Sequence, residues 1–202
     1  METTPRRRPT ASAAVLALTA AGALLAAPTA AYAGTTTYDF RCTPPEQYHD
    51  HFPPFDAEVT VELTGPATAA PGATVALQAT ATLDPPQRAP GIVNLVGGLR
   101  GSAVTGTLDI AGSAGGSAEL ASPGATADRI RGGDVIELRP FTGDFTVAGA
   151  GTVDLTPGDV VIRIDAPILG PFDTPCVTPE DGTRPGVAHS ITVEGAQGTD
   201  QE

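Results

Sequence analysis

The chain has 202 residues, contains no lysine, and carries 11 arginines against 23 acidic residues, which gives a formal net charge of −12 at pH 7. A field this negative repels nucleic acid and anionic lipid, so we expect no nucleic-acid partner. Without lysine the chain cannot form a Schiff base, anchor pyridoxal phosphate or build a lysine-containing phosphate loop.

The first 33 residues have the three parts of a secretory signal peptide. Residues 6–8 are a basic stretch of arginines, residues 13–27 are an apolar stretch, and Ala31-Tyr32-Ala33 is a small-x-small cleavage site. We predict that residues 1–33 form the signal peptide and that the mature chain starts at Gly34.

Export determines where we expect the rest of the chain. The chain after the signal peptide is long enough for one domain, which we assign to residues 34–194, followed by a polar tail at 195–202. No cysteine follows the cleavage site directly, and no later apolar run approaches the ~20 residues of a membrane helix. We predict a protein without a membrane span, secreted to the outside of the cell or loosely associated with the cell wall.

The two cysteines of the chain allow one intramolecular pair, and an exported protein meets oxidising conditions. A reactive thiol pair and a metal site are the alternatives, but the spacing is not that of a CxxC motif and no histidine stands beside either cysteine. We predict a Cys42–Cys176 disulfide that joins the first strand to a late one. It would close a loop of about 135 residues, for which the chain-entropy model gives on the order of 5 kcal/mol.

Apolar and polar residues alternate along much of the chain after the signal, which is typical of half-buried β-strands. We predict about ten short strands and no helix longer than two turns. In chain order the predicted strands are 38–41, 58–64, 74–84, 91–95, 104–110, 134–138, 144–148, 152–156, 159–165 and 190–194.

Proline-glycine pairs recur between these segments. Proline presets φ near −65° at the first central position of a turn and glycine accepts the positive φ of the second, so each pair is a candidate type II turn. The pairs are Pro71-Gly72, Pro90-Gly91, Pro123-Gly124, Pro157-Gly158 and Pro185-Gly186.

Frequent turns between strands with one apolar face predict an all-β domain. The arrangement that we favour is an antiparallel β-sandwich with Greek-key connections, and the alternative is a closed β-barrel. Two segments resist assignment. Residues 112–116 are glycine-rich and predict a mobile loop, and residues 41–54 contain too many prolines for a central strand.

Several of these patterns together resemble a known family. They are Tyr38-Asp39-Phe40-Arg41-Cys42, an alternating strand that ends near Leu63, Ala70-Pro71-Gly72 before a second such strand, the segments 145–149 and 151–158, and Pro175-Cys176. In this order they resemble the secreted domains of unknown function in actinobacterial cell-envelope proteins. The resemblance implies an immunoglobulin-like β-sandwich with a Cys-Cys clamp and supplies no catalytic residue. The proline-rich, histidine-containing segment 44–55 departs from the family.

The segment 48–52 is the one candidate metal site. In an extended chain His49 and His51 point to the same side, and with Glu46 or Asp56 they could bind zinc or copper. A complete site needs a further ligand, and the remaining histidine is His189. The alternative, which we favour, is a solvated loop whose histidines titrate near pH 6.5.

The same part of the chain gathers aromatic residues. Tyr38, Phe40, Tyr48, Phe52 and Phe55 are five of the eight aromatic residues that remain after signal removal. Aromatic side chains on a proline-stiffened loop suit a binding surface, which makes Tyr48, Phe52 and Phe55 candidate binding residues. They equally suit a plug over an open end of a β-sandwich, and we favour the plug because the chain has few other large side chains to bury.

Motifs for nucleophilic catalysis are missing. Ser113 lacks the glycine pattern of a nucleophile elbow, and Ser190 directly follows His189, so on a strand the two point to opposite faces. We therefore predict no catalytic residue, no cofactor, and a non-enzymatic secreted or wall-associated structural or binding module. Its expected partner is a cell-wall component or another extracellular protein. The alternative is a metal-binding protein or metal-dependent enzyme centred on His49 and His51.

Overall fold

The computed structural model describes residues 31–195, except 96, 114 and 123–128. The predicted signal up to residue 30, the tail after residue 195 and the Pro123-Gly124 pair lie outside the described residues. Strands dominate the described part, which confirms the predicted all-β class. The strands are β1 (Ala31–Cys42), β2 (Phe55–Pro66), β3 (Thr68–Ala69), β4 (Thr74–Asp84), β5 (Leu99–Gly112), β6 (Gly116–Ala121), β7 (Arg129–Ile130), β8 (Phe141–Thr146), β9 (Gly151–Ala166), β10 (Gly170–Val177) and β11 (His189–Val193).

Helical structure in the described part is limited to two 3-10 turns, η1 (Glu46–Tyr48) and η2 (Gly91–Asn94). This agrees with the prediction that no helix exceeds two turns. Among the same residues, no helix has the length and apolar character needed to cross a membrane.

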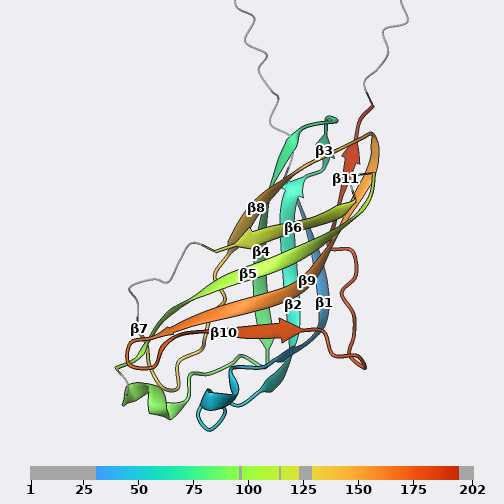
Figure 1. Cartoon of the computed structure of the whole chain (residues 1–202). Helices are drawn as coiled ribbons and strands as arrows, with labels where there is room; N and C mark the ends of the chain where they lie inside the picture. Colours follow the sequence, from blue (N-terminus) through green and yellow to red (C-terminus); the bar gives the residue numbers. More distant parts are fainter. Residues whose placement is uncertain (1–30, 96, 114, 123–128, 196–202) are drawn as a thin grey trace, which may run out of the picture.

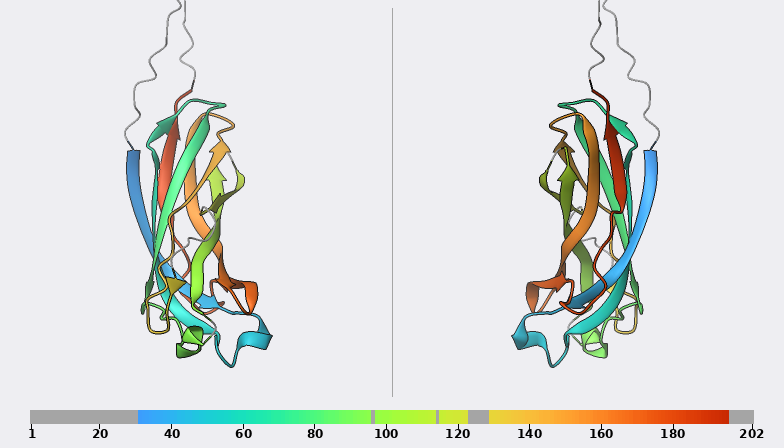
Figure 2. Two further views of the ribbon diagram at one scale, coloured as in Figure 1. Left: turned by 90° about the vertical axis from the view of Figure 1, so that its left-hand side faces the viewer. Right: turned by 90° about the vertical axis from the view of Figure 1, so that its right-hand side faces the viewer.

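The strands form one hydrogen-bonded sheet that closes on itself (Figure 1). Starting at β1, the pairing runs through β2, β4, β8, β6, β5, β9 and β10 and returns to β1. Two contacts in this circuit are narrow: β6 and β8 share one register pair, and β1 and β10 share two. The circuit is flattened, so its strands lie in two facing layers (Figure 2). The layers are therefore joined at both edges, whereas the predicted sandwich would have two separate sheets.

The core lies between the two layers and follows the alternation of the sequence. Along β4 every second side chain is buried, from Val75 to Leu83, and the side chains between them are exposed. This strand has the bounds predicted from the sequence. The turn before it also forms as predicted, because Ala73 N donates to Ala70 O at 3.0 Å and Gly72 has a φ of +77°.

The predicted turn at Pro157-Gly158 is wrong. β9 runs without interruption from Gly151 to Ala166, so the two predicted strands on either side of the pair are one strand. Pro157 lies opposite Leu108 of β5, next to a register shift between Gly106 and Leu108. Such an irregularity accommodates a proline, since the residue has no N–H to give to the ladder.

Two predicted strands are also wrong. Residues 91–94 form η2, in which Val93 N donates to Pro90 O at 3.0 Å, and Leu95 follows it. Residues 134–138 do not form a strand. One isolated β-bridge, between Arg88 and Val135, joins them to the segment that contains Arg88. Alternation therefore did not show how either backbone would pair, and in the first segment Val93 is buried whereas Leu95 is 79% exposed.

Some strands were missed at the sequence level. β10 contains Pro171 and Pro175, which argue against a strand, yet both side chains are exposed and the residues between them alternate inward. The glycine-rich segment 112–116 begins with the last residue of β5 and ends with the first residue of β6, which pairs with β5.

Candidate functional site

The segment between β1 and β2 closes the lower end of the molecule in Figure 1. Its η1 turn directs Tyr48 toward β10, where the Tyr48 hydroxyl donates to Leu169 O at 3.1 Å and the ring lies 4.6 Å from that of Phe172. Phe52 packs on the same Phe172 ring at 5.4 Å and is only 7% exposed. The burial of Phe52 favours the plug over an exposed aromatic surface.

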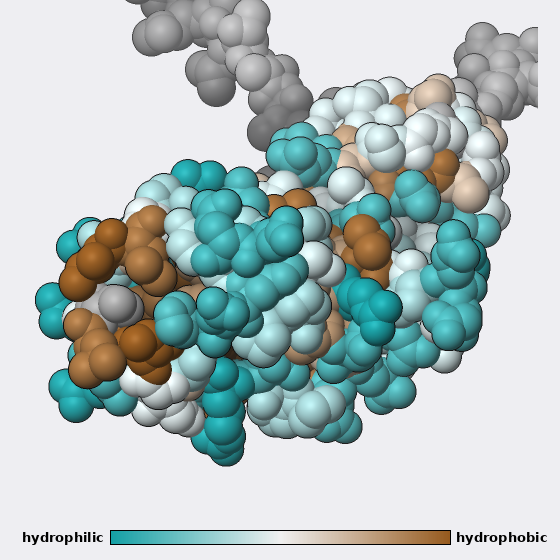
Figure 3. All heavy atoms as spheres, turned by 60° about the horizontal axis from the view of Figure 1, so that its bottom comes forward, coloured by the Kyte–Doolittle hydropathy of each residue, from teal (hydrophilic) through white to brown (hydrophobic). Residues whose placement is uncertain are grey.

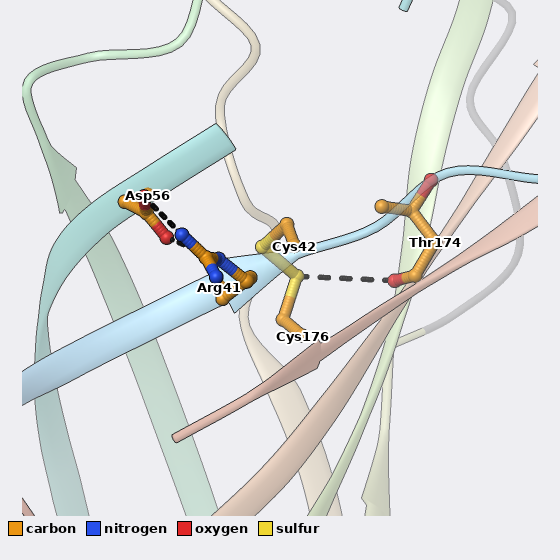
Figure 4. The surroundings of a disulfide bond; sticks show 5 residues. All are labelled: Arg41, Cys42, Asp56, Thr174 and Cys176. Carbon is orange, nitrogen blue, oxygen red and sulfur yellow. Dashed lines mark hydrogen bonds and ion pairs between the residues drawn. A yellow bond between two sulfur atoms is a disulfide. The ribbon is translucent and has the colours of Figure 1, made fainter. Parts of the chain in front are cut away.

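The Cys42–Cys176 disulfide forms as predicted and fastens this end (Figure 4). It links β1 to β10 at one of their two register pairs. Beside it Arg41 and Asp56 form a two-pronged ion pair across β1 and β2, with Nε to Oδ1 at 2.8 Å and Nη2 to Oδ2 at 2.9 Å. The hydrogen bond from Arg41 lowers the pKa of the Asp56 carboxyl. Both side chains are exposed, so this ion pair links β1 and β2 at the protein surface. It is not a buried charged site.

The predicted metal ligands are not joined by a third one. His49 Nε2 lies 2.7 Å from Pro44 O, and His51 is exposed. His189 is buried at the start of β11, at the opposite end of the molecule, with Nε2 at 3.1 Å from Pro66 O. Across the described part of the chain no group of three His, Cys, Asp or Glu residues is placed to hold a metal ion.

Ser190 and His189 lie on opposite faces of β11, as the alternation predicts. His189 is buried, whereas Ser190 is exposed and donates to Asp154 Oδ1 at 2.6 Å. A hydrogen bond between the hydroxyl and the imidazole, which nucleophilic catalysis would need, is therefore not formed.

A cavity of about 280 Å³ opens beneath the 43–55 segment, between the two layers. Its wall is formed by the end of β4, the C-terminal part of β9, β10, the start of β2 and the segment 134–138. Most of the wall is hydrophobic. The large apolar side chains are Phe52, Phe55, Leu83, Ile136, Leu138, Ile162 and Ile164.

Polar side chains reach the cavity at its exposed margin. His51 and Arg88 are exposed and Gln87 is half-buried. Arg88 Nη1 donates to Gly133 O at 2.8 Å, which holds the guanidinium over the segment that precedes Ile136. The mouth is therefore polar and cationic, while the interior is apolar.

Thr174 is the exception inside the cavity. It occupies an inward position of β10, between Phe172 and Cys176, and is 2% exposed. Its backbone oxygen lies 3.8 Å from Cys176 Sγ, and its side chain points away from the disulfide (Figure 4). The buried hydroxyl has no hydrogen-bond partner among the residues that the structure describes.

Hydrophobic side chains are also exposed at this end of the molecule. Figure 3 shows them gathered on the side where η2, β7 and the β9–β10 turn lie. Leu95 is 79% exposed after η2, and Ile168 is 69% exposed in the turn. The lower end thus carries the two most exposed large hydrophobic side chains of the described residues.

No protein family, no curated protein and no solved structure matches this chain. The resemblance to secreted actinobacterial domains stays a prediction.

The sequence predictions and the cavity overlap only in part. Three residues that we singled out from the sequence line the cavity: His51, Phe52 and Phe55. They contribute to its wall as part of the segment that closes this end of the molecule. Thr174 and Leu138 were missed. Leu138 lies in a segment predicted as a strand, which marked it as apolar, whereas nothing in the local sequence marks Thr174, because a threonine on an alternating strand is usually solvent-facing.

Proposed function

We propose that the mature chain is a non-enzymatic, secreted or wall-associated binding module that holds a small apolar ligand in the cavity beneath the 43–55 segment. The observation that carries this proposal is the cavity itself, about 280 Å³ with a hydrophobic wall and a polar mouth. Apolar pockets with few polar groups are the usual form of small-molecule sites, because transfer of an apolar ligand out of water is favourable.

The size of the cavity limits the ligand. A dry protein cavity of about 150 Å³ accepts benzene. A cavity of roughly twice that volume accommodates about ten carbon atoms, such as two fused rings or a short aliphatic chain. A cell-wall component or an extracellular protein would be a partner if it presents an apolar group of this size.

Export is part of the proposal. A disulfide between β1 and β10 suits an oxidising compartment, and the predicted signal peptide supplies the route. The large negative net charge keeps a secreted domain soluble while the apolar end stays available.

Naphthalene is the probe for this function. We expect it to shift the methyl resonances of Ile136, Ile162 and Ile164 in methyl-labelled mature protein, and to leave those of Ile191, on β11 outside the cavity wall, unchanged. Failure of naphthalene to perturb the cavity methyl groups at its solubility limit would contradict the proposal.

A matched pair of variants locates the site. Ile136→Trp places a large ring in the cavity wall, and Val135→Trp places the same ring on the neighbouring, exposed side chain outside that wall. We expect Ile136→Trp to weaken naphthalene binding at least about tenfold, since the ring takes the ligand's volume. Val135→Trp should bind as the wild type does, and equal affinities of the two variants would place the ligand elsewhere.

The metal-binding alternative is separated by elemental analysis of the protein purified without an affinity tag. A stoichiometric transition metal that is lost in a His49→Ala, His51→Ala variant would favour that alternative over the apolar-ligand module.

A further inference from the structure

Resting on the proposed function, we infer that the ligand carries one uncharged hydrogen-bonding group, a hydroxyl, carbonyl or amide, which pairs with the hydroxyl of Thr174 inside the cavity. The inference combines three observations: an apolar cavity, a threonine among its lining residues whose side-chain hydroxyl is buried, and the lack of any protein partner for that hydroxyl among the described residues.

The position of Thr174 is that of a core residue. On β10 it alternates inward with Phe172 and Cys176, and it lies opposite Ile162 of β9, which also lines the cavity. Valine has nearly the same shape and would fill this position without a polar atom. Burial of a hydroxyl without a partner costs free energy, so a hydroxyl retained here points to a partner supplied from outside the chain.

The ligand's hydrogen-bonding group is uncharged because of its surroundings in the cavity. Phe52, Leu83 and Ile162 surround the cavity interior, and an ionised group placed there would lose its hydration without a counter-charge. The cationic side chain of Arg88 is exposed at the margin, as is His51. A carboxylate would therefore be drawn to the mouth, while a neutral oxygen or nitrogen can enter as far as Thr174.

A polar group built into an apolar pocket discriminates strongly between ligands with and without a matching group, because the mismatched complex leaves the pocket's own group unpaired. Thr174 would thus act as the residue that determines specificity, and the hydrophobic wall would supply most of the affinity.

The test compares naphthalene with 2-naphthol, which differ by one hydroxyl, in wild type and Thr174→Val. Titration of methyl-labelled protein with each compound gives the dissociation constants of naphthalene and 2-naphthol from the shifts of the cavity methyl resonances. We expect the preference for 2-naphthol over naphthalene to be about tenfold greater in wild type than in Thr174→Val, which corresponds to about 1.4 kcal/mol. Naphthalene itself should bind the variant as tightly as wild type or more tightly.

Thr174→Ser is the matched control, since it keeps the hydroxyl and removes only a methyl group. We expect it to retain the wild-type preference for 2-naphthol, and it keeps the test valid if the valine variant folds poorly. Denaturant unfolding of Thr174→Val should give a free energy of unfolding equal to or above that of wild type, because an unpaired buried hydroxyl is removed.

Three outcomes would count against the inference. If both ligands bind the cavity and Thr174→Val does not change their ratio, Thr174 does not meet the ligand, although the proposed function stands. If 2-naphthoate binds more tightly than 2-naphthol and Arg88→Gln removes that advantage, the polar group lies at the mouth. If neither naphthalene nor 2-naphthol perturbs the cavity methyl groups, the proposed function itself fails.

Discussion

Tyr38 is the largest polar side chain in the core. It is fully buried on β1, its ring contacts that of Phe40 edge to face at 4.9 Å, and its hydroxyl donates to Gly158 O at 3.4 Å. Burial, and after it the negative charge of Asp159, raise the pKa of the Tyr38 hydroxyl well above its ordinary value. The folded chain therefore keeps this proton at a pH where the unfolded chain has lost it.

This difference predicts a loss of stability in alkali. Below about pH 10 the contribution of Tyr38 is complete, and above it the free energy of unfolding should fall with pH, because the unfolded state binds fewer protons than the folded state. The chain has no lysine, so few other groups titrate in this range. We expect Tyr38→Phe to flatten the fall, measured by urea unfolding between pH 9 and pH 11. An unchanged slope in the variant would assign the fall to other groups.

At the level of elements, the circuit of strands is narrowest where β6 meets β8. The register pair there is Ala121 with Thr142, and the next residue of β8 is Gly143. A Cβ on Gly143 would collide with the backbone oxygen of Glu119. The absence of a side chain thus lets the two strands approach closely enough to join the two layers.

Gly143→Ala should open this contact. We expect the free energy of unfolding to fall by about 2 kcal/mol, the usual cost of forcing extra atoms into a packed site, measured in urea. Gly91→Ala is the control, since a Cβ there meets nothing within 4 Å. Similar losses in the two variants would show that the effect comes from glycine replacement in general.

At the scale of the whole molecule, the disulfide joins residues that are 134 positions apart in the sequence. β1 and β10 share only two register pairs, so the covalent bond does most to keep them together. It also fixes the strand that carries Thr174 against the strand that leads into the 43–55 segment. The disulfide therefore stabilises the cavity end as well as the fold.

Removal of the bond should be costly. We expect Cys42→Ser with Cys176→Ser to lower the free energy of unfolding by about 2–5 kcal/mol, mainly because the unfolded chain gains freedom. Thiol titration of the denatured, unreduced wild-type protein should detect no free thiol. A double variant as stable as wild type, or a titration that finds two thiols, would refute the structural role.

The predicted cleavage bond lies inside β1, where Ala33 is paired with Thr64 and Gly34 with Leu63. A peptide bond in a paired strand is a poor protease substrate, so we expect cleavage before folding, as in general secretion of an unfolded chain. The mass of the exported protein should correspond to a start at Gly34. A mass that includes residues 31–33 would place the cleavage earlier and keep the full length of β1.

Local pattern was sufficient for much of the strand content. The alternation along β4, the Pro71-Gly72 turn and the pairing of two cysteines each depend on properties of neighbouring residues or on counting, and each could be predicted from the sequence. The segment at the lower end was also recognised as unusual, since its aromatic and proline content is a local property.

What the tertiary structure decided depends on contacts between distant segments. Pro157 continues β9 instead of ending it, because the pairing of β9 with β5 is irregular at that point. Whether residues 134–138 pair as a strand was settled by the neighbours available to them. The cavity is assembled from segments as far apart as Phe52 and Thr174, so no local pattern could reveal it. The burial that leaves the Thr174 hydroxyl without a protein partner is likewise a property of the closed fold, because each strand alone would leave that side chain in water.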